Sequence, residues 1–171
     1  MRGEGRRSRA ATPGSVALAW AASLGLGACA RDADAPPTVA YGQAVCATCN
    51  MIVSEPRFAS AVVAPTRRPD PLIFDDFGCL LDHPSTGSAA GSRIWVHDHE
   101  TEAWLAAETA WYLRSPDVRT PMGSGVLAFR ERATAERERS DRGGTVLGWK
   151  ELCEANQRNP LVAPPPGSDA K

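Results

Sequence analysis

The N-terminal leader is the feature that most constrains the fold, because it decides how much chain is left to build a domain. Four of the first nine residues are arginine, and a short apolar run follows at residues 16–28. A basic start followed by an apolar run that ends in small residues is typical of a secretory signal peptide, and this run is too short to span a membrane comfortably. We therefore predict that residues 1–28 are a signal peptide.

The apolar run ends in Leu26-Gly27-Ala28-Cys29, which has the layout of a bacterial lipobox. In such a signal the cysteine thiol receives a diacylglycerol group before cleavage exposes its amine. A plain signal peptide with a chance cysteine is the alternative, but Cys29 stands where the motif requires it. Because several acyl chains on one cysteine anchor a protein firmly, we predict a lipid anchor on Cys29, attachment to a membrane of the cell envelope, and a domain that faces the periplasm.

Without residues 1–28, 143 residues remain, enough for one compact domain or two small sub-domains. Residues 29–38 are polar and contain proline, so we expect a flexible tether. Residues 39–156 are the predicted folded domain, whereas residues 157–171 are predicted to be a disordered tail. With 19 basic and 20 acidic side chains and a formal net charge of −1, the composition gives no indication of nucleic-acid binding.

The pattern of apolar residues predicts an α+β domain made of two related strand–strand–helix units. In the first unit, two short apolar runs at 58–64 and 71–74 predict a hairpin, and Asp75 or Asp76 is expected to cap the helix that follows. We expect the second unit to begin with a strand at 93–98. It continues with predicted strands at 109–113, 126–129 and 145–149 and with a charged helix at 131–142.

The segment Cys46-Ala47-Thr48-Cys49-Asn50-Met51 places two thiols and a thioether within six residues. Soft sulfur ligands select copper(I) over hard cations, and no second pair of cysteines or histidines at zinc spacing follows. A disulfide between Cys46 and Cys49 is nearly as well supported, because the envelope is oxidising. A thioredoxin-like redox pair is the third alternative, although such a pair should open a helix after a buried strand. Spacing alone leaves all three open.

Four blocks of sequence resemble the NosL family, which comprises lipoproteins encoded with nitrous oxide reductase. In chain order they read CNMIVSEPRFA at 49–59, FDDFGCLL at 74–81, WVHD at 95–98, and PMGSG at 121–125 with AF at 128–129. The resemblance implies two related α+β sub-domains, similar in fold to organomercurial lyase. It also implies a periplasmic copper(I) chaperone that supplies the copper–sulfide catalytic cluster of nitrous oxide reductase.

The same resemblance implies copper ligands at particular positions. Cys49 and Met51 match the family's Cys-Gly-Met element, and Met122 matches the methionine of its Pro-Met-Gly element. We therefore expect a Cys49 thiolate and thioethers from Met122 and Met51, in a site that straddles the two sub-domains. The alternative for Met122 is a gap-filling core residue. Asn50 stands where the family usually has glycine, but asparagine tolerates left-handed backbone better than most residues, so the turn should survive.

Other side chains have less support as ligands. His97 is a candidate further ligand, with Asp98 as its hydrogen-bond partner, although a histidine on a strand is more often structural. His99 is less favoured than His97. Cys79 is expected to pack in the core, as free cysteines commonly do. Cys153 lies near the C-terminal edge of the domain, where a metal ligand is least expected.

Three functions remain to be separated. The first is metal delivery without catalysis, in which copper(I) passes by ligand exchange to apo nitrous oxide reductase; a copper ion shared between two copies of the chain is compatible with it. The second is an enzyme of the organomercurial lyase type that uses Cys49, Cys79 and Asp75. The third is a thiol–disulfide protein that uses Cys46 and Cys49. The resemblance favours the first, so no catalytic residue is predicted.

Overall fold

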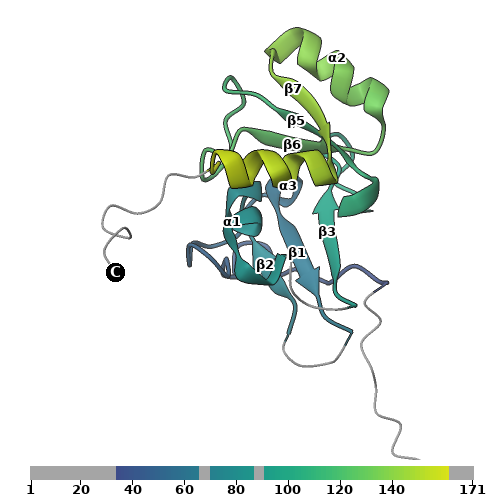
Figure 1. Cartoon of the computed structure of the whole chain (residues 1–171). Coiled ribbons are helices and arrows are strands. Elements are labelled where there is room, and N and C mark those ends of the chain that lie inside the picture. Colours follow the sequence, from purple (N-terminus) through teal and green to yellow (C-terminus); the bar gives the residue numbers. More distant parts are fainter. Residues whose placement is uncertain (1–33, 66–69, 87–90, 162–171) are drawn as a thin grey trace, which may run out of the picture.

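The computed structural model describes residues 34–65, 70–86 and 91–161 (Figure 1). The predicted signal peptide, Cys29, the first part of the tether and most of the predicted tail lie outside these residues. Within the described part, no helix is long and apolar enough to cross a membrane. The end of the predicted tether is described, and Asp34 forms an ion pair there with Arg93.

The first sub-domain is a four-stranded antiparallel sheet with one short helix. Its elements are β1 (Ser60–Val63), β2 (Leu72–Phe74), α1 (Phe77–Asp82), β3 (Arg93–His97) and β4 (Trp104–Ala106), with 3-10 turns at Pro56–Phe58 and Pro84–Thr86. The strand order is β2-β1-β3-β4. Ser60 of β1 lies opposite Phe74 on one side and Val96 on the other. β1 thus has a strand on each edge, and all four of its residues are buried.

The second sub-domain is a three-stranded antiparallel sheet with two helices. Its elements are β5 (Trp111–Arg114), β6 (Val126–Phe129), α2 (Arg132–Arg142), β7 (Thr145–Gly148) and α3 (Trp149–Arg158), preceded by a 3-10 turn at Ala107–Thr109. The strand order is β6-β5-β7, and Tyr112 of β5 lies opposite Ala128 and Leu147. β6 has the predicted bounds, and α2 begins one residue later than predicted.

The two sub-domains repeat one topology, as expected for an α+β fold of two related units. Each runs strand, strand, helix, strand, with its first strand in the centre of the sheet. The prediction that the second unit begins at residue 93 is wrong, because β3 pairs with β1 in the first sheet. Only this pairing covers the second edge of β1, and local sequence does not reveal it.

β4 was not predicted. The strand predicted at 145–149 ends at Gly148, because Trp149 begins α3, which reaches into the predicted tail.

Two layers of core meet at the second sheet. Successive residues of a strand point to opposite faces, so Tyr112 packs in the larger core with Phe74, Phe77 and Leu80 of the first sub-domain, whereas Leu113 packs on the other face. The smaller core on that face contains Leu127, Phe129 and Ala135, the one buried residue of α2. Figure 1 shows α2 on the outer side of this sheet and α3 between the sheet and α1.

Two buried carboxylates join the sub-domains at the two ends of the β6 segment. Asp76, ahead of α1, accepts a hydrogen bond of 3.0 Å from the backbone N–H of Met122, before β6. Asp98, after β3, accepts one of 2.7 Å from the backbone N–H of Arg130, after β6. If a buried carboxylate lost such a donor, the folded state would lose stability, because the carboxylate would remain desolvated without a hydrogen bond in return. These contacts therefore hold the loop that carries Met122 against the first sub-domain.

Candidate metal site

Cys46 and Cys49 lie in a tight hairpin before the first sheet. The backbone N–H of Cys46 donates to the carbonyl of Met51 at 2.8 Å, and the N–H of Asn50 donates to the carbonyl of Cys46 at 3.1 Å. Val45 pairs with Ile52 across the hairpin as a single antiparallel bridge. Asn50 has a φ of 62°, so asparagine adopts the left-handed backbone that the turn was expected to need.

The hairpin is held against the segment that leads from β2 into α1. The backbone N–H of Ala47 donates to the carbonyl of Ile73 at 2.8 Å, and the Thr48 hydroxyl donates to the carbonyl of Cys79 at 2.7 Å. On the other side, Asp76 is the N-cap of α1 and accepts from the N–H of Gly78 at 2.7 Å. Cys79 is thereby fixed in the first turn of α1, facing the hairpin.

These contacts bring three thiols together. The sulfur atoms of Cys46, Cys49 and Cys79 all lie within 4.8 Å of one another, the only such group of histidine, cysteine and carboxylate ligands in the described ranges. Three sulfurs bound to one ion at about 2.3 Å lie about 4 Å apart, so the group is already close to a three-coordinate site. All four described cysteines are free thiols. The arrangement suits one soft metal ion.

The three sulfur atoms differ in burial and in charge. Cys46 is fully buried and Cys79 is buried, whereas Cys49 is partly exposed. The pKa of Cys46 is lowered to about 4, mainly by a hydrogen bond from Cys79. Burial of Cys46 opposes this shift, whereas hydrogen bonds from backbone N–H groups of Cys49, Asp75 and Thr48 add to it. The same hydrogen bond, with burial, raises the pKa of Cys79, and burial raises that of Cys49. At neutral pH the group therefore holds one thiolate and two thiols.

Asp75 and Asp76 have different roles beside this cluster. Asp76 caps the helix, as one of the two was expected to do. Asp75 is buried, and its Oδ1 atom has no hydrogen-bond partner among the described residues. Burial raises the pKa of Asp75, the N–H of Ser54 opposes this, and the neighbouring Cys46 charge adds to the rise. The region around the sulfur atoms therefore already carries negative charge that a bound cation would offset.

The two candidate methionines occupy different positions. Met122 is partly buried and packs against the core that contains the cysteines, and its backbone is tied to Asp76 at the start of α1. Gly125 of the same loop has a φ of 66°, and a side chain there would clash with the carbonyl of Ser115. The loop thus depends on glycine to bring Met122 toward the first sub-domain. Met51 is in the hairpin, but its side chain is 57% exposed.

His97 already uses both of its ring nitrogens. Its Nε2 lies 2.7 Å from the hydroxyl of Tyr41 and its Nδ1 lies 2.7 Å from the carbonyl of Glu102. The ring is buried against Trp104, with ring centroids 3.7 Å apart, and burial lowers the pKa of His97. The expected pairing with Asp98 is wrong, because that carboxylate accepts from the 100–101 turn and from Arg130. This geometry is that of a structural histidine.

The remaining candidates lie apart from the sulfur cluster. His99 packs between Phe58 and Phe129, and its Nδ1 is buried without a partner in the described residues. Cys153 is on α3, where burial raises its pKa to about 11. Neither residue belongs to the group of three cysteines.

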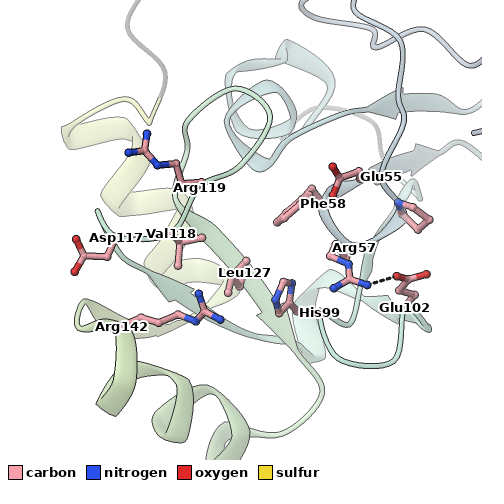
Figure 2. A pocket seen from close by; sticks show the side chains of 11 residues that line it. Glu55, Arg57, Phe58, His99, Glu102, Asp117, Val118, Arg119, Leu127 and Arg142 are labelled. Carbon is pink, nitrogen blue, oxygen red and sulfur yellow. Dashed lines mark hydrogen bonds and ion pairs between the residues drawn. The ribbon is translucent and has the colours of Figure 1, made fainter. Parts of the chain in front are cut away.

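The cleft between the two sub-domains is a separate feature. It has a volume of about 580 Å³, and Figure 2 shows its side chains, among them Phe58, His99 and Val118. Arg57 and Glu102 form an ion pair of 2.6 Å at its edge. Its lining contains no cysteine or methionine. The cleft therefore lacks the soft ligands that the sequence pointed to, and the cysteine cluster remains the candidate site.

Sequence reasoning found part of this cluster. It selected Cys49, but it favoured Met122 over Cys46 and assigned Cys79 to the core. Cys79 is indeed in the core, yet its sulfur also faces the other two. The available signal was its position three residues after the helix cap, in the first turn of a helix that follows an edge strand. From that position one can predict that the Cys79 side chain lies near the end of the sheet, but not that the hairpin with Cys46 and Cys49 packs against it.

Comparisons with known proteins give the family and the fold of the chain. A family model described as NosL matches residues 37–156, which is more than two thirds of the chain. The fold is similar to the crystal structure of the copper chaperone NosL from Shewanella denitrificans, with a TM-score of 0.54 and 20% sequence identity. That match covers 70% of this chain and 99% of the other. No curated protein matches the sequence significantly.

Proposed function

Because the chain belongs to the NosL family, we propose that it binds copper(I) through Cys46, Cys49 and Cys79 and delivers the ion to another protein. The observation that carries the proposal is the approach of three sulfur atoms to within 4.8 Å of one another. Delivery of a bound ion needs no catalytic step, in keeping with the expectation that the chain is not an enzyme. Copper is therefore cargo in this proposal, not a catalytic cofactor.

The donor set suits copper(I) for two reasons. Thiolates are soft ligands, which favour copper(I) over the hard cations that carboxylates bind. The lowered pKa of Cys46 provides one thiolate before the metal arrives. Binding displaces the protons of Cys49 and Cys79, so the affinity rises with pH. Cys49 is the partly exposed member, and we assign entry and exit of the ion to its side of the cluster.

The methionines supplement the thiolates in this proposal. Met122 approaches from the second sub-domain on a loop tied to Asp76, which is a suitable position for a fourth, weaker sulfur ligand. Met51 is exposed beside the hairpin, where a thioether can meet an incoming or departing ion. His97 has no free ring nitrogen, so we assign it a structural role.

The sequence supports a proposal for the location and the partner of the chain. The lipobox supports acylation of Cys29 and a position at the cell envelope facing the periplasm. Family membership supports apo nitrous oxide reductase as the recipient, with the copper–sulfide cluster as the destination of the ion. A copper ion shared between two copies of the chain would appear as one copper per two chains.

The decisive experiment is titration of the reduced soluble domain, residues 30–171, with copper(I) in competition with bathocuproine disulfonate. We expect one copper per chain, and a large loss of affinity in Cys46→Ser, Cys49→Ser and Cys79→Ser. Cys153→Ser is the matched control and should bind as tightly as the wild type. Undiminished binding in the Cys46 and Cys79 variants would refute the three-cysteine site.

A thiol–disulfide function is the second candidate, because Cys46 is a low-pKa thiolate three residues from Cys49. It predicts that the metal-free domain exchanges disulfides with glutathione and that the Cys79→Ser variant still does so. If the wild type bound no copper but showed this exchange, the second candidate would replace the first.

A further inference from the structure

The cleft between the two sub-domains is a hollow with partly apolar walls. Its volume of about 580 Å³ is within the range of small-molecule pockets. Phe58, Val118 and Leu127 line it and belong to the smaller core, so packing fixes their positions. His99 also lines it, with its ring centroid 5.9 Å from that of Phe58 and 5.8 Å from that of Phe129. The cleft therefore has the size and part of the lining of a ligand site.

Two arginines bring positive charge to the cleft, one from each sub-domain. Arg57 lies in the 3-10 turn before β1, and Arg142 is the last residue of α2. Both line the cleft, and Figure 2 shows them on the two sides of His99. Burial lowers the pKa of His99, the charges of Arg57 and Arg142 lower it further, and Glu138 and Asp98 oppose them. The two guanidinium groups therefore act on the same point of the cleft.

Each of these guanidinium groups uses only part of its hydrogen-bonding capacity. Arg57 donates through Nη2 to Glu102 at 2.6 Å, and Arg142 donates through Nε to Glu138 at 2.7 Å. A guanidinium has five N–H donors, and the described ranges supply no further acceptor to either side chain. Paired N–H groups of this kind bind carboxylate and phosphate oxygens. The donors that remain therefore fit an oxyanion.

Acidic residues also line the cleft, but they leave the region between the two arginines positive. Glu102 is the ion-pair partner of Arg57 at the edge of the cleft. Figure 2 shows the carboxylate of Asp117 turned away from His99, and Glu55 beside Phe58. Neither Asp117 nor Glu55 is among the charges that shift the pKa of His99. An anion near the ring would therefore meet the arginines first.

The ring of His99 supplies a further donor. Its Nδ1 is buried and has no partner among the described residues. Its Nε2 likewise makes no hydrogen bond in the described ranges, but it is not buried. A neutral imidazole carries its proton on one nitrogen, and a buried N–H without an acceptor is costly. The proton therefore belongs on Nε2, where a ligand in the cleft can accept it.

We propose that this cleft binds a small organic oxyanion, namely a carboxylate or phosphate group attached to an apolar body. The charged group lies between Arg57 and Arg142 and accepts a hydrogen bond from Nε2 of His99. The apolar body packs on Phe58 and Leu127. The ligand contacts both sub-domains, and the cleft contains no cysteine or methionine, so this site is separate from the proposed copper site.

The test uses small probes that separate the charge from the apolar body. Benzoate and phenyl phosphate carry both parts, acetate and inorganic phosphate carry only the charge, and benzamide carries only the ring. With the reduced, metal-free full chain, we expect the better of the first two to bind with a Kd of about 1 mM or below. It should bind at least about tenfold more tightly than the probe with the same charged group alone, and benzamide should not bind. The tighter of the two identifies the oxyanion as carboxylate or phosphate.

Nuclear magnetic resonance shows where the probe binds. The ring resonances of His99 should shift on titration, whereas those of His83 and His97 should not, because neither ring lines the cleft. A shift confined to His83 or His97, or no saturable shift with either aromatic anion, would overturn the proposal. Equal binding of benzoate and benzamide would also overturn it, since the charge would then have no role.

Substitutions test the two arginines. R57Q/R142Q should weaken binding of the better probe at least about tenfold, because both charge-assisted contacts are lost. R142Q alone, at the exposed end of α2, repeats the test in a variant with a smaller effect on folding. R137Q is the matched control, since Arg137 is on the same helix and pairs with Glu100 at 2.7 Å but does not line the cleft. Wild-type affinity in R142Q, or an equal loss in R137Q, would refute the site.

Discussion

The two sub-domains have one topology but differ at the turn where the second strand enters the helix. In the first, Asp76 caps α1 with its side chain and Cys79 is the third helical residue. In the second, Glu131 stands at the cap without a side-chain bond and Thr134 is the third residue of α2. The shared backbone therefore offers the same position twice. Only the first copy places sulfur there, and the hairpin of Cys46 and Cys49 lies beside it.

The two helices also differ in what stabilises them. α1 has six residues and buries four of them, so packing holds it in place despite its short length. α2 has eleven residues and buries only Ala135, while ion pairs such as Arg139–Glu136 and Arg142–Glu138 cover its exposed face. Such pairs contribute little each. The helix that carries Cys79 is therefore held by buried contacts, whereas α2 is largely exposed.

The sharpest test of this difference replaces the two equivalent helical residues. Cys79→Ser should lower the copper(I) affinity on the order of a thousandfold, because one of three soft ligands becomes a hard oxygen. Thr134→Ser, at the matching position of α2, should leave it unchanged. Both are measured by chelator competition. Equal affinities in the two variants would show that the first helix is no more important for metal binding than the second.

The caps provide a second contrast, in stability. Asp76→Ala should lower the free energy of unfolding by about 2–4 kcal/mol, since it removes a helix cap and the bond to Met122 inside the protein. Glu131→Ala should change it by less than about 0.5 kcal/mol, because this side chain is exposed and makes no cap bond. Urea denaturation of the metal-free domain measures both. A similar loss in the two variants would contradict the bridging role of Asp76.

Met122 tests whether the second sub-domain contributes a ligand. Met122→Leu keeps the volume of the side chain and removes the sulfur, so we expect the unfolding free energy to change by less than about 1.5 kcal/mol. Copper affinity should fall about tenfold, which corresponds to about 1.4 kcal/mol. Met51→Leu is the exposed comparison, with a smaller effect. An affinity that Met122→Leu leaves unaltered would confine the site to the first sub-domain.

Cys46 gives the cluster a pH dependence that the second sub-domain lacks. The hydrogen bond from Cys79 lowers the pKa of Cys46 from its ordinary value of 9.0 to about 4 in the folded protein. A group with a depressed pKa stabilises the fold fully above its unfolded pKa, and this contribution is lost as the pH falls from 9 toward 4. Ultraviolet absorbance of the reduced, metal-free domain should show a thiolate that persists at pH 6. The signal should be absent in Cys46→Ser and present in Cys153→Ser; a thiolate that disappears near pH 8 would contradict the assignment.

His97 should have the smallest effect on copper. His97→Gln breaks the bonds to Tyr41 and Glu102, so we expect a loss of about 1–3 kcal/mol in unfolding free energy. Copper affinity should change less than about twofold, because the ring nitrogens are already occupied. A tenfold weaker affinity with unchanged stability would instead make His97 a ligand.

Local structure was largely predictable from local sequence. The strand at 126–129, the charged helix and a cap at Asp75 or Asp76 follow from apolar period, charge pattern and capping chemistry, all of which act within a few residues. The failures have long-range causes. β3 was assigned to the wrong unit because its partner β1 is about thirty residues earlier, and α3 was missed because Trp149 continued the strand pattern into the helix.

The sequence by itself determined the family, through four ordered blocks, and the soft chemistry of the segment around Cys49. It could not choose between a disulfide, a redox pair and a metal site, because two cysteines at this spacing suit all three. The tertiary structure decided which sulfurs meet. Cys79 is thirty residues from Cys49, and only the docking of the hairpin on β2 and α1 places its thiol beside the other two. The spacing of cysteines along the chain does not say which sulfur atoms come together, because that is decided by how the hairpin, β2 and α1 pack in the core.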